Sequence, residues 1–257
     1  MTDAFLKGTV VVRSTVDDVA AECASWLLDL ARSAIASNGT FTIALSGGST
    51  PRTLFRLLAA SANPAYGWEN WQVYFVDERG CSPGDAASNY HLAQTLFNAV
   101  PIPSSHIHRM EGEHRPLEEA AAQYAEIIDS LPKVNGMPHL DCILLGMGAD
   151  GHTASLFPGT APLHEMRRTT VTNTAPAAPH ERLSITFPVI NAAGHVAFLV
   201  TGGEKGTALA DTAAGVTPAS HVDPTPGGLY WFLDQEAYDA LDDALAQREH
   251  HDPAGQQ

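Results

Sequence analysis

The stretch Leu144-Leu-Gly-Met-Gly-Ala-Asp-Gly-His-Thr-Ala-Ser-Leu-Phe-Pro158 is the most informative part of this 257-residue chain. An apolar run at 142–145 predicts a buried strand, and the run ends abruptly in glycines. Glycine lets the backbone turn with a positive φ and come close to a ligand. Asp150 and His152 follow at once, and an imidazole can exchange a proton near neutral pH. The stretch therefore predicts a buried strand whose end presents a carboxylate and an imidazole for chemistry.

Working outward from this strand, strands and helices are expected to alternate. Apolar runs or strand composition mark further strands at 9–13, 41–45, 73–76, 169–172, 183–187, 196–200 and 229–233. Helical spacing of apolar residues marks helices at 15–34, 51–58, 91–97, 117–131, after 206 and at 238–245. Most strand runs are uninterrupted, which is typical of strands buried on both faces. We therefore expect an α/β fold with a mostly parallel sheet and helices on both faces.

No internal repeat or long linker interrupts this pattern, so residues 1–246 are expected to form a single domain. Residues 247–257 are predicted to be a disordered tail. No apolar run approaches the roughly 20 residues that span a bilayer, and no secretory signal is expected. Three cysteines match no metal spacing, and Cys23 and Cys142 fall on apolar faces. Buried, reduced thiols indicate a reducing compartment, and we expect the cytoplasm.

The charge of the chain is strongly negative. It carries 14 Lys and Arg against 29 Asp and Glu, a formal net charge of −15. Such a chain repels nucleic acid and anionic membranes, so neither is expected as a partner. An anionic small ligand would need a local cluster of the few cations, helped by backbone N–H groups. A Lys or Arg beside a glycine motif is therefore more informative than usual.

Four predicted strands carry glycine or charged motifs just past their C-terminal ends, at 46–52, 77–80, 146–152 and 201–206. In sheets of this kind ligands bind beyond the carboxyl ends of the strands, so the four segments are expected to form one site. In the first segment, Ser46, Gly47, Gly48 and Ser49 link a strand to a helix and predict a phosphate cradle. A tight turn with a Thr cap, with Pro51 as first helical residue, is the alternative.

The remaining segments supply charges. Asp77 and Arg79 follow a strand and either face the cleft or form a surface ion pair. Lys205 lies in a glycine-rich turn and Arg182 precedes a strand. Each alone would be a solvated surface charge, but because cations are scarce they are predicted phosphate partners.

Two other kinds of chemistry find little support in the sequence. Asp150, His152 and Asp77 could together bind a metal, but zinc sites usually show several His or Cys at recurring spacing. We therefore expect no metal. Nucleophilic catalysis would be favoured by a Gly-x-Ser-x-Gly elbow, and the chain contains none.

Together these motifs resemble the 6-phosphogluconolactonase family, which shares a superfamily with the glucosamine-6-phosphate deaminases. The resemblance covers nearly the whole chain and rests on Ala44-Leu-Ser-Gly-Gly-Ser-Thr-Pro51, Val76-Asp-Glu-Arg79 with Ser88-Asn-Tyr90, Gly146 to Pro158, Glu181-Arg-Leu-Ser-Ile-Thr186 and Thr201-Gly-Gly-Glu-Lys205. It implies a Rossmann-like fold and hydrolysis of 6-phospho-D-glucono-1,5-lactone to 6-phosphogluconate, the second step of the oxidative pentose phosphate pathway. It also implies that neither a metal nor an organic cofactor is needed.

Two departures separate the chain from the deaminases. Deaminases continue past the Asp-Gly-His into a segment that carries a Glu for proton transfer, whereas here Thr153 to Pro158 contains no acid. Arg79 stands where deaminases tend to carry an aromatic residue. A glucosamine-6-phosphate deaminase or isomerase and a non-catalytic phosphosugar-binding protein are the alternatives. The retained Asp150 and His152 argue against mere binding, because binding requires no proton shuttle.

The expected mechanism assigns a role to each residue. His152 would remove a proton from the attacking water and return it to the departing ring oxygen, with Asp150 orienting the imidazole. The phosphate would lie on the 46–49 loop with Arg182 and Lys205, while Asp77 and Arg79 would line the sugar region. We expect a monomer, although the sequence leaves an oligomer open.

Overall fold

The computed structural model describes residues 5–251. Its centre is a six-stranded sheet in which every pair of neighbours is parallel. The strands, in spatial order, are β1 (Thr9–Arg13), β11 (Gly228–Asp234), β10 (His195–Val200), β7 (Cys142–Leu145), β2 (Phe41–Leu45) and β3 (Trp71–Phe75). All four side chains of β7 are fully buried, as its uninterrupted apolar run predicts. The expected mostly parallel sheet is confirmed.

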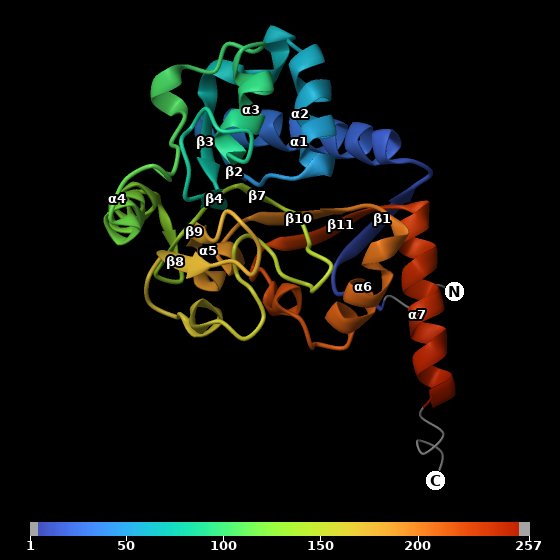
Figure 1. Ribbon diagram of the computed structural model, residues 1–257. Helices are drawn as coiled ribbons and strands as arrows, with labels where there is room; N and C mark the ends of the chain where they lie inside the picture. The colour runs from blue at the N-terminus through green and yellow to red at the C-terminus, as the bar shows by residue number, and fades with distance from the viewer. Residues whose placement is uncertain (1–4, 252–257) are drawn as a thin grey trace.

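Helices cover both faces of this sheet (Figure 1). On one side lie α1 (Val16–Asn38), α2 (Ser49–Ala60) and α3 (Asn89–Phe97). On the other lie α5 (Phe187–Asn191), α6 (Gly206–Ala213) and α7 (Gln235–His251). Helix α1 begins as its sequence predicts, because the Thr15 hydroxyl accepts a hydrogen bond from the Asp18 N–H at 3.2 Å. Short 3-10 helices lie at Pro64–Tyr66, Trp68–Asn70, Ser104–His106, Ala161–His164, Gly203–Lys205 and Pro218–His221.

A second, antiparallel sheet differs from the sequence-based expectation. It contains β4 (Asp77–Arg79), β9 (Glu181–Ile185) and β8 (Thr170–Thr174), and α4 (Leu117–Asp129) packs against β8 and β9. The charged segment at 77–80 was expected to follow a strand as a loop, but its first three residues form a strand themselves. This strand was missed because its polar residues do not look like a buried strand. A two-stranded hairpin, β5 (Lys133–Val134) and β6 (Met137–Pro138), completes the strands.

The strand order reverses between β2 and β7. From β2 the chain continues to β3 at one edge, whereas β7, β10 and β11 follow on the opposite side of β2. At such a reversal the connecting segments leave in opposite directions, and a crevice opens at the carboxyl ends of the two strands. The motifs at 46–52 and 146–152 follow these two strands, so both lie at the crevice.

The C-terminal boundary predicted from the sequence is wrong. Helix α7 continues to His251, so residues 247–251 are helical, and 252–257 lie outside the described residues. Arg248 ties the end of α7 to α6 by an ion pair with Asp211 and a 3.2 Å hydrogen bond to the Ala210 carbonyl. The last turn of α7 was not predicted because apolar residues are sparse there. Among residues 5–251, no helix is both long and apolar enough to cross a membrane.

Candidate active site

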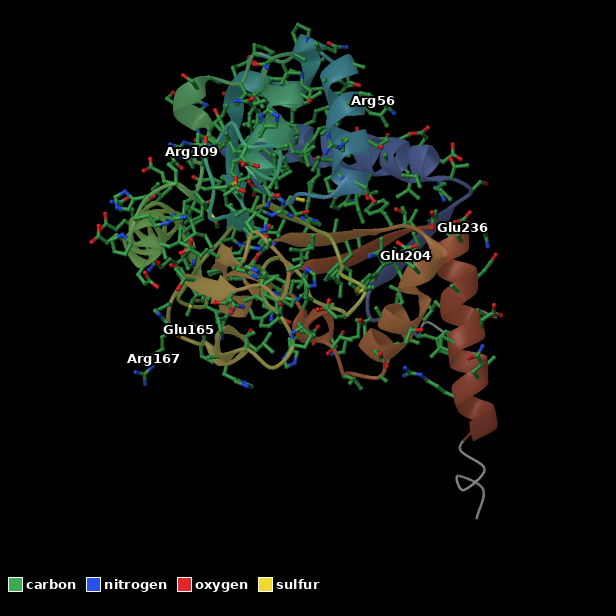
Figure 2. The ribbon with its side chains drawn as sticks, in the orientation of Figure 1. Arg56, Arg109, Glu165, Arg167, Glu204 and Glu236 are labelled. Atoms are coloured by element: carbon green, nitrogen blue, oxygen red, sulfur yellow. The ribbon has the colours of Figure 1, made fainter. Side chains whose placement is uncertain are left out.

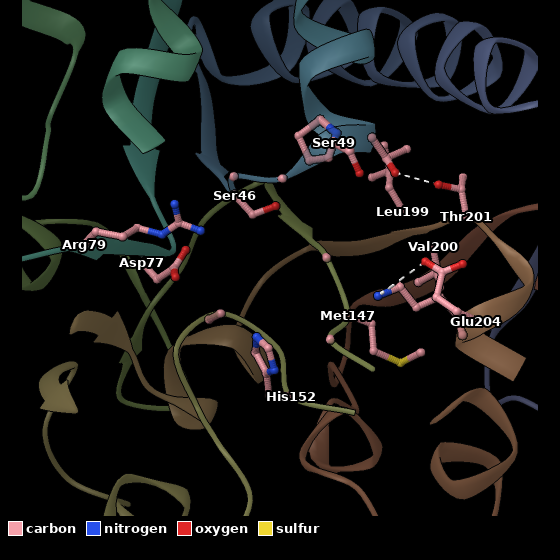
Figure 3. Close-up of a pocket in the computed structure, with 18 residues that line it drawn as sticks. Ser46, Ser49, Asp77, Arg79, Met147, His152, Leu199, Val200, Thr201 and Glu204 are labelled. Atoms are coloured by element: carbon pink, nitrogen blue, oxygen red, sulfur yellow. Dashed lines mark hydrogen bonds and ion pairs between the residues drawn. The ribbon is translucent and has the colours of Figure 1, made fainter. Parts of the chain in front are cut away.

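A cavity of about 250 Å³ lies at the carboxyl ends of β2, β7 and β10 (Figure 3). Residues from all four motif segments line it, as expected from the parallel sheet. Of the predicted site residues, the wall contains Ser46, Gly47, Gly48, Ser49, Asp77, Arg79, His152 and Lys205. Asp150 and Arg182 do not line the cavity. The structure thus brings together segments that lie far apart along the chain.

The 46–52 segment forms an uncapped helix start. Helix α2 begins at Ser49, earlier than the expected start at Pro51, and its N-cap is Gly48, which supplies no capping side chain. The expected alternative, a Thr cap, is wrong: the Thr50 hydroxyl instead lies 2.8 Å from the Thr201 hydroxyl. The first N–H groups of a helix have no partner within the helix. The buried Ser46 hydroxyl also has no hydrogen-bond partner within residues 5–251. These groups leave donors available to an anion.

Asp77 is a buried carboxylate with both oxygens held in place. The Asn89 amide donates to Oδ1 of Asp77 at 2.8 Å and to its carbonyl at 2.9 Å. The Ser155 hydroxyl donates to Oδ2 at 2.7 Å. The Asn89 side chain also packs against Gly47, where an added Cβ would lie 1.9 Å from its Oδ1. Asn89 and Ser155 were not assigned roles from the sequence, although both lie in the quoted motifs, because spacing alone does not show that they bond to Asp77.

The neighbouring carboxylate, Glu78, anchors the start of α3. It accepts hydrogen bonds from the N–H groups of Arg79, Asn89 and Tyr90 and from the Ser88 hydroxyl, at 2.7–2.9 Å. Burial raises the pKa of Glu78 above its ordinary value, and these hydrogen bonds oppose that shift. A carboxylate is favoured at a helix N-terminus, where backbone N–H groups point outward. Glu78 therefore fixes the strand that carries Asp77 and Arg79 against α3.

Arg79 and Arg182 lie opposite one another on β4 and β9. Arg79 donates to the Ala87 carbonyl, and its Nε is buried without a partner among the described residues. Nη1 of Arg182 is likewise buried and unpaired there. Burial lowers the pKa of Arg182 below its ordinary value, the charge of Arg79 lowers it further, and Asp77 opposes both. Arg79 thus lines the cavity, whereas Arg182, the predicted phosphate partner, lies beside Arg79 and does not line it.

Asp150 and His152 form a close pair. His152 Nδ1 lies 2.5 Å from Asp150 Oδ1, which also accepts the His152 backbone N–H at 3.2 Å. Partial burial raises the pKa of Asp150, but the hydrogen bonds and charge of His152 outweigh it, so the pKa falls below its ordinary value. An ionised carboxylate only accepts hydrogen bonds, so Nδ1 carries the proton and Nε2 of a neutral ring is a free base. Figure 3 shows the ring facing the space between Ser46 and Met147.

The glycines of this loop are required by close contacts. A Cβ at Gly148 would lie 2.1 Å from His152 Nδ1 and 2.6 Å from Asp150 Oδ1. Gly151 has a φ of +72° and packs against Thr217, and its carbonyl accepts the Ala219 N–H at 3.0 Å. The glycine at 148 therefore leaves room for the Asp–His pair, and the one at 151 docks the loop on the segment after α6.

The 201–206 segment is held by a buried acid at the end of β11. Asp234 accepts the Gly202 N–H at 3.0 and 3.1 Å and the Ala237 N–H at 2.9 Å. Lys205 follows at the start of α6, with its side chain only 20% exposed. Asp234 had no predicted role, because the sequence shows no link between β11 and this turn.

The metal alternative is not supported by the arrangement of side chains. Within residues 5–251, no three His, Cys, Asp or Glu side chains gather closely enough to hold a metal ion. Asp77 is occupied by Asn89 and Ser155, and Asp150 by His152.

Comparisons with known proteins agree with this arrangement. The family model described as glucosamine-6-phosphate isomerases/6-phosphogluconolactonase matches residues 14–231. A rice (Oryza sativa subsp. indica) protein named probable 6-phosphogluconolactonase 2 is 35% identical over 246 residues, 88% of this chain and 87% of that protein. An Arabidopsis thaliana protein of the same name is 35% identical, covering 90% and 94%. A solved structure of 6-phosphogluconolactonase from Trypanosoma cruzi is 27% identical, with a TM-score of 0.80, covering 91% of this chain and 97% of that one. With the family's motifs at the crevice of a Rossmann-like sheet, the chain belongs to the 6-phosphogluconolactonase family.

Proposed function

We propose that this protein hydrolyses 6-phospho-D-glucono-1,5-lactone to 6-phospho-D-gluconate, in the oxidative pentose phosphate pathway. The observation that carries the proposal is the Asp150–His152 pair facing a cavity whose opposite wall holds an uncapped helix N-terminus. The pair suits the activation of water, and the helix N-terminus suits a phosphate. The names of the curated relatives support the same reaction.

In the proposed reaction, His152 Nε2 takes a proton from a water molecule as its oxygen attacks C1 of the lactone. The tetrahedral intermediate then collapses, the bond between C1 and the ring oxygen breaks, and the imidazolium returns the proton to that oxygen. Asp150 keeps the proton on Nδ1 and stabilises the imidazolium. The products are a carboxylic acid, which ionises, and a free hydroxyl.

The rest of the cavity positions the substrate in this proposal. The phosphate accepts hydrogen bonds from the Ser46 hydroxyl and the first N–H groups of α2, and pairs with Lys205. Asp77 and Arg79 contact the sugar hydroxyls, and Arg182 adds positive charge through its position beside Arg79. Binding the phosphate at one end places C1 against His152 at the other, and such positioning converts binding energy into rate.

The direct test is lactone hydrolysis by His152→Ala, corrected for spontaneous hydrolysis. Loss of a general base should lower kcat about 10²- to 10⁴-fold. The matched control is His164→Ala, which removes an exposed imidazole outside the cavity and should retain full activity. Near wild-type turnover by His152→Ala would rule out His152 as the general base. In the same assay, Lys205→Met should mainly raise KM, and an unchanged KM would exclude Lys205 as a phosphate contact.

The alternative functions are tested with the same purified protein. The segment after His152 contains no acid, which favours the lactonase over a deaminase. Ammonia release from glucosamine-6-phosphate, at a rate comparable to lactone hydrolysis, would reverse this preference. Tight phosphosugar binding with no turnover of either substrate would instead indicate a binding protein.

The proposal includes the working state of the enzyme: a cytoplasmic monomer that needs no metal or organic cofactor. Three free cysteines, two of them buried, support a reducing compartment. The net charge of −15 argues against nucleic-acid and membrane partners. Activity that survives exhaustive chelation, with a monomer mass in light scattering, is the expected result. Loss of activity restored by one added metal would contradict it.

A further inference from the structure

The cavity wall contains an acid beside its lysine. Glu204 lines the cavity next to Lys205, and its Oε1 lies 3.9 Å from Lys205 Nζ. Figure 3 shows this contact on the side of the cavity opposite Asp77 and Arg79. Among residues 5–251, Asp77 is the only other acid in the wall, and both its oxygens are already bonded. A carboxylate at the end of the cavity proposed for phosphate would repel that phosphate.

The Glu204 carboxylate is held weakly. Its side chain is 67% exposed, and no hydrogen bond to it is found among the described residues. It folds back over Gly202, where an added Cβ would lie 2.3 Å from Oε2. Glycine at that position therefore allows the carboxylate to lie close to the turn. Because little holds it there, the side chain can rotate into solvent without breaking a buried contact.

We propose that Glu204 is an internal counter-ion of Lys205 that competes with the phosphate group of the substrate. This inference rests on the proposed function, because it assigns the Lys205 end of the cavity to phosphate. In the empty site the Glu204 carboxylate neutralises part of the Lys205 charge. A bound phosphate dianion pairs with Lys205 in place of Glu204 and repels the Glu204 carboxylate, which moves outward.

The consequence is a uniform change in phosphosugar affinity. Glu204 lies at the phosphate end, and the substrate and the product carry the same phosphate. It therefore weakens the binding of the lactone, the transition state and the product by the same factor. Such uniform binding alters KM and leaves kcat unchanged. Glu204 thus lowers the affinity of the site for phosphosugars and limits inhibition by the accumulating product.

The test compares Glu204→Gln with wild type in lactone hydrolysis. The isosteric amide should lower KM, and the inhibition constant of 6-phosphogluconate, by the same factor of about two to five, the size expected for an exposed ion pair. The value of kcat should stay the same. Added salt should shrink both differences, because it screens exposed charges.

Glu236→Gln is the matched control. Glu236 is exposed at the start of α7 close to Gly203, does not line the cavity, and carries the same charge (Figure 2). The KM of Glu236→Gln should equal that of wild type. If KM falls equally in both variants, the effect comes from net charge alone and the counter-ion role is wrong. An unchanged or raised KM in Glu204→Gln overturns the inference.

Inorganic phosphate separates this inference from the proposed function. Calorimetric titration needs no turnover, and Glu204→Gln should bind phosphate about two- to fivefold more tightly than wild type. If phosphate binds wild type and Glu204→Gln equally, the counter-ion role is wrong while the phosphate site stands. If phosphate binds neither protein and Lys205→Met leaves KM unchanged, the phosphate site itself fails.

Discussion

At the scale of single residues, the Asp150–His152 pair shows both what a motif predicts and what it leaves out. The sequence predicted the two side chains at the end of a buried strand, and the structure places them 2.5 Å apart. It did not predict that Asn89 and Ser155 hold Asp77, or that Asp234 holds the 201–206 turn. Those partners are joined only by folding. Asn89 and Ser155 lie within quoted motifs, but local spacing does not show which side chain in one motif bonds to which in another.

Asp150→Asn tests the orienting role of the carboxylate. An amide can donate to Nδ1, which would put the ring in the wrong tautomer, so kcat should fall about 10²- to 10⁴-fold with little change in KM. Because its pKa is lowered, Asp150 stays ionised below its ordinary range and adds no limb to the pH–rate profile between pH 5 and 8. The stabilisation from this pair is present above the ordinary pKa and is lost as the pH falls through the lowered one. A variant with kcat within threefold of wild type would contradict the role.

At the scale of elements, apolar runs predicted strands well where both faces are buried. The runs at 41–45 and 142–145 match β2 and β7 at both ends. The prediction failed at β4, where Asp77 and Glu78 are buried by hydrogen bonds rather than by apolar character. Helix α7 was underestimated for a related reason, since its last turn is tied to α6 through Arg248. Elements held by polar contacts carry no hydrophobic pattern to detect.

Gly148→Ala tests whether the loop after β7 shapes the catalytic pair. The added methyl would meet the imidazole and the carboxylate at 2.1 and 2.6 Å, so it must displace one of them. Misplacement of a catalytic group by about 1 Å can cost about 10²-fold in rate, and we expect a fall in kcat of that size. Gly84→Ala is the control, because the nearest atom lies 3.9 Å away and its activity should be unchanged. Equal activities of the two variants would show that the loop tolerates the crowding.

At the scale of the whole molecule, the described residues form one unit around a continuous core. The tryptophans report on both ends of the large sheet. Trp71 lies on β3 at one edge with Trp68 beside it. Trp231 lies on β11 near the other edge, and Trp26 packs against Tyr230 and Phe232 of the same strand. Sequence predicted a single domain because no linker was visible, and unfolding experiments can test this prediction.

In Trp68→Phe/Trp71→Phe, fluorescence follows the β11 end, and in Trp26→Phe/Trp231→Phe it follows the β3 end. For a single cooperative unit, fluorescence and circular dichroism should give one urea midpoint within each variant. Because both midpoints are measured on the same variant, any loss of stability caused by the substitutions affects both equally. Separate midpoints in either variant would divide the chain into two units.

The pairing of β1 with β11 bears on how the protein is made. Thr9 lies opposite Tyr230, so two strands from opposite ends of the described chain pair with each other. Closing a loop of that length costs conformational entropy before any contact compensates for it, which slows folding. Asp234, which holds the Lys205 turn, also ends β11. A growing chain therefore completes neither the β1 edge of the sheet nor this turn until β11 has been synthesised, and β1 lacks its partner strand until then.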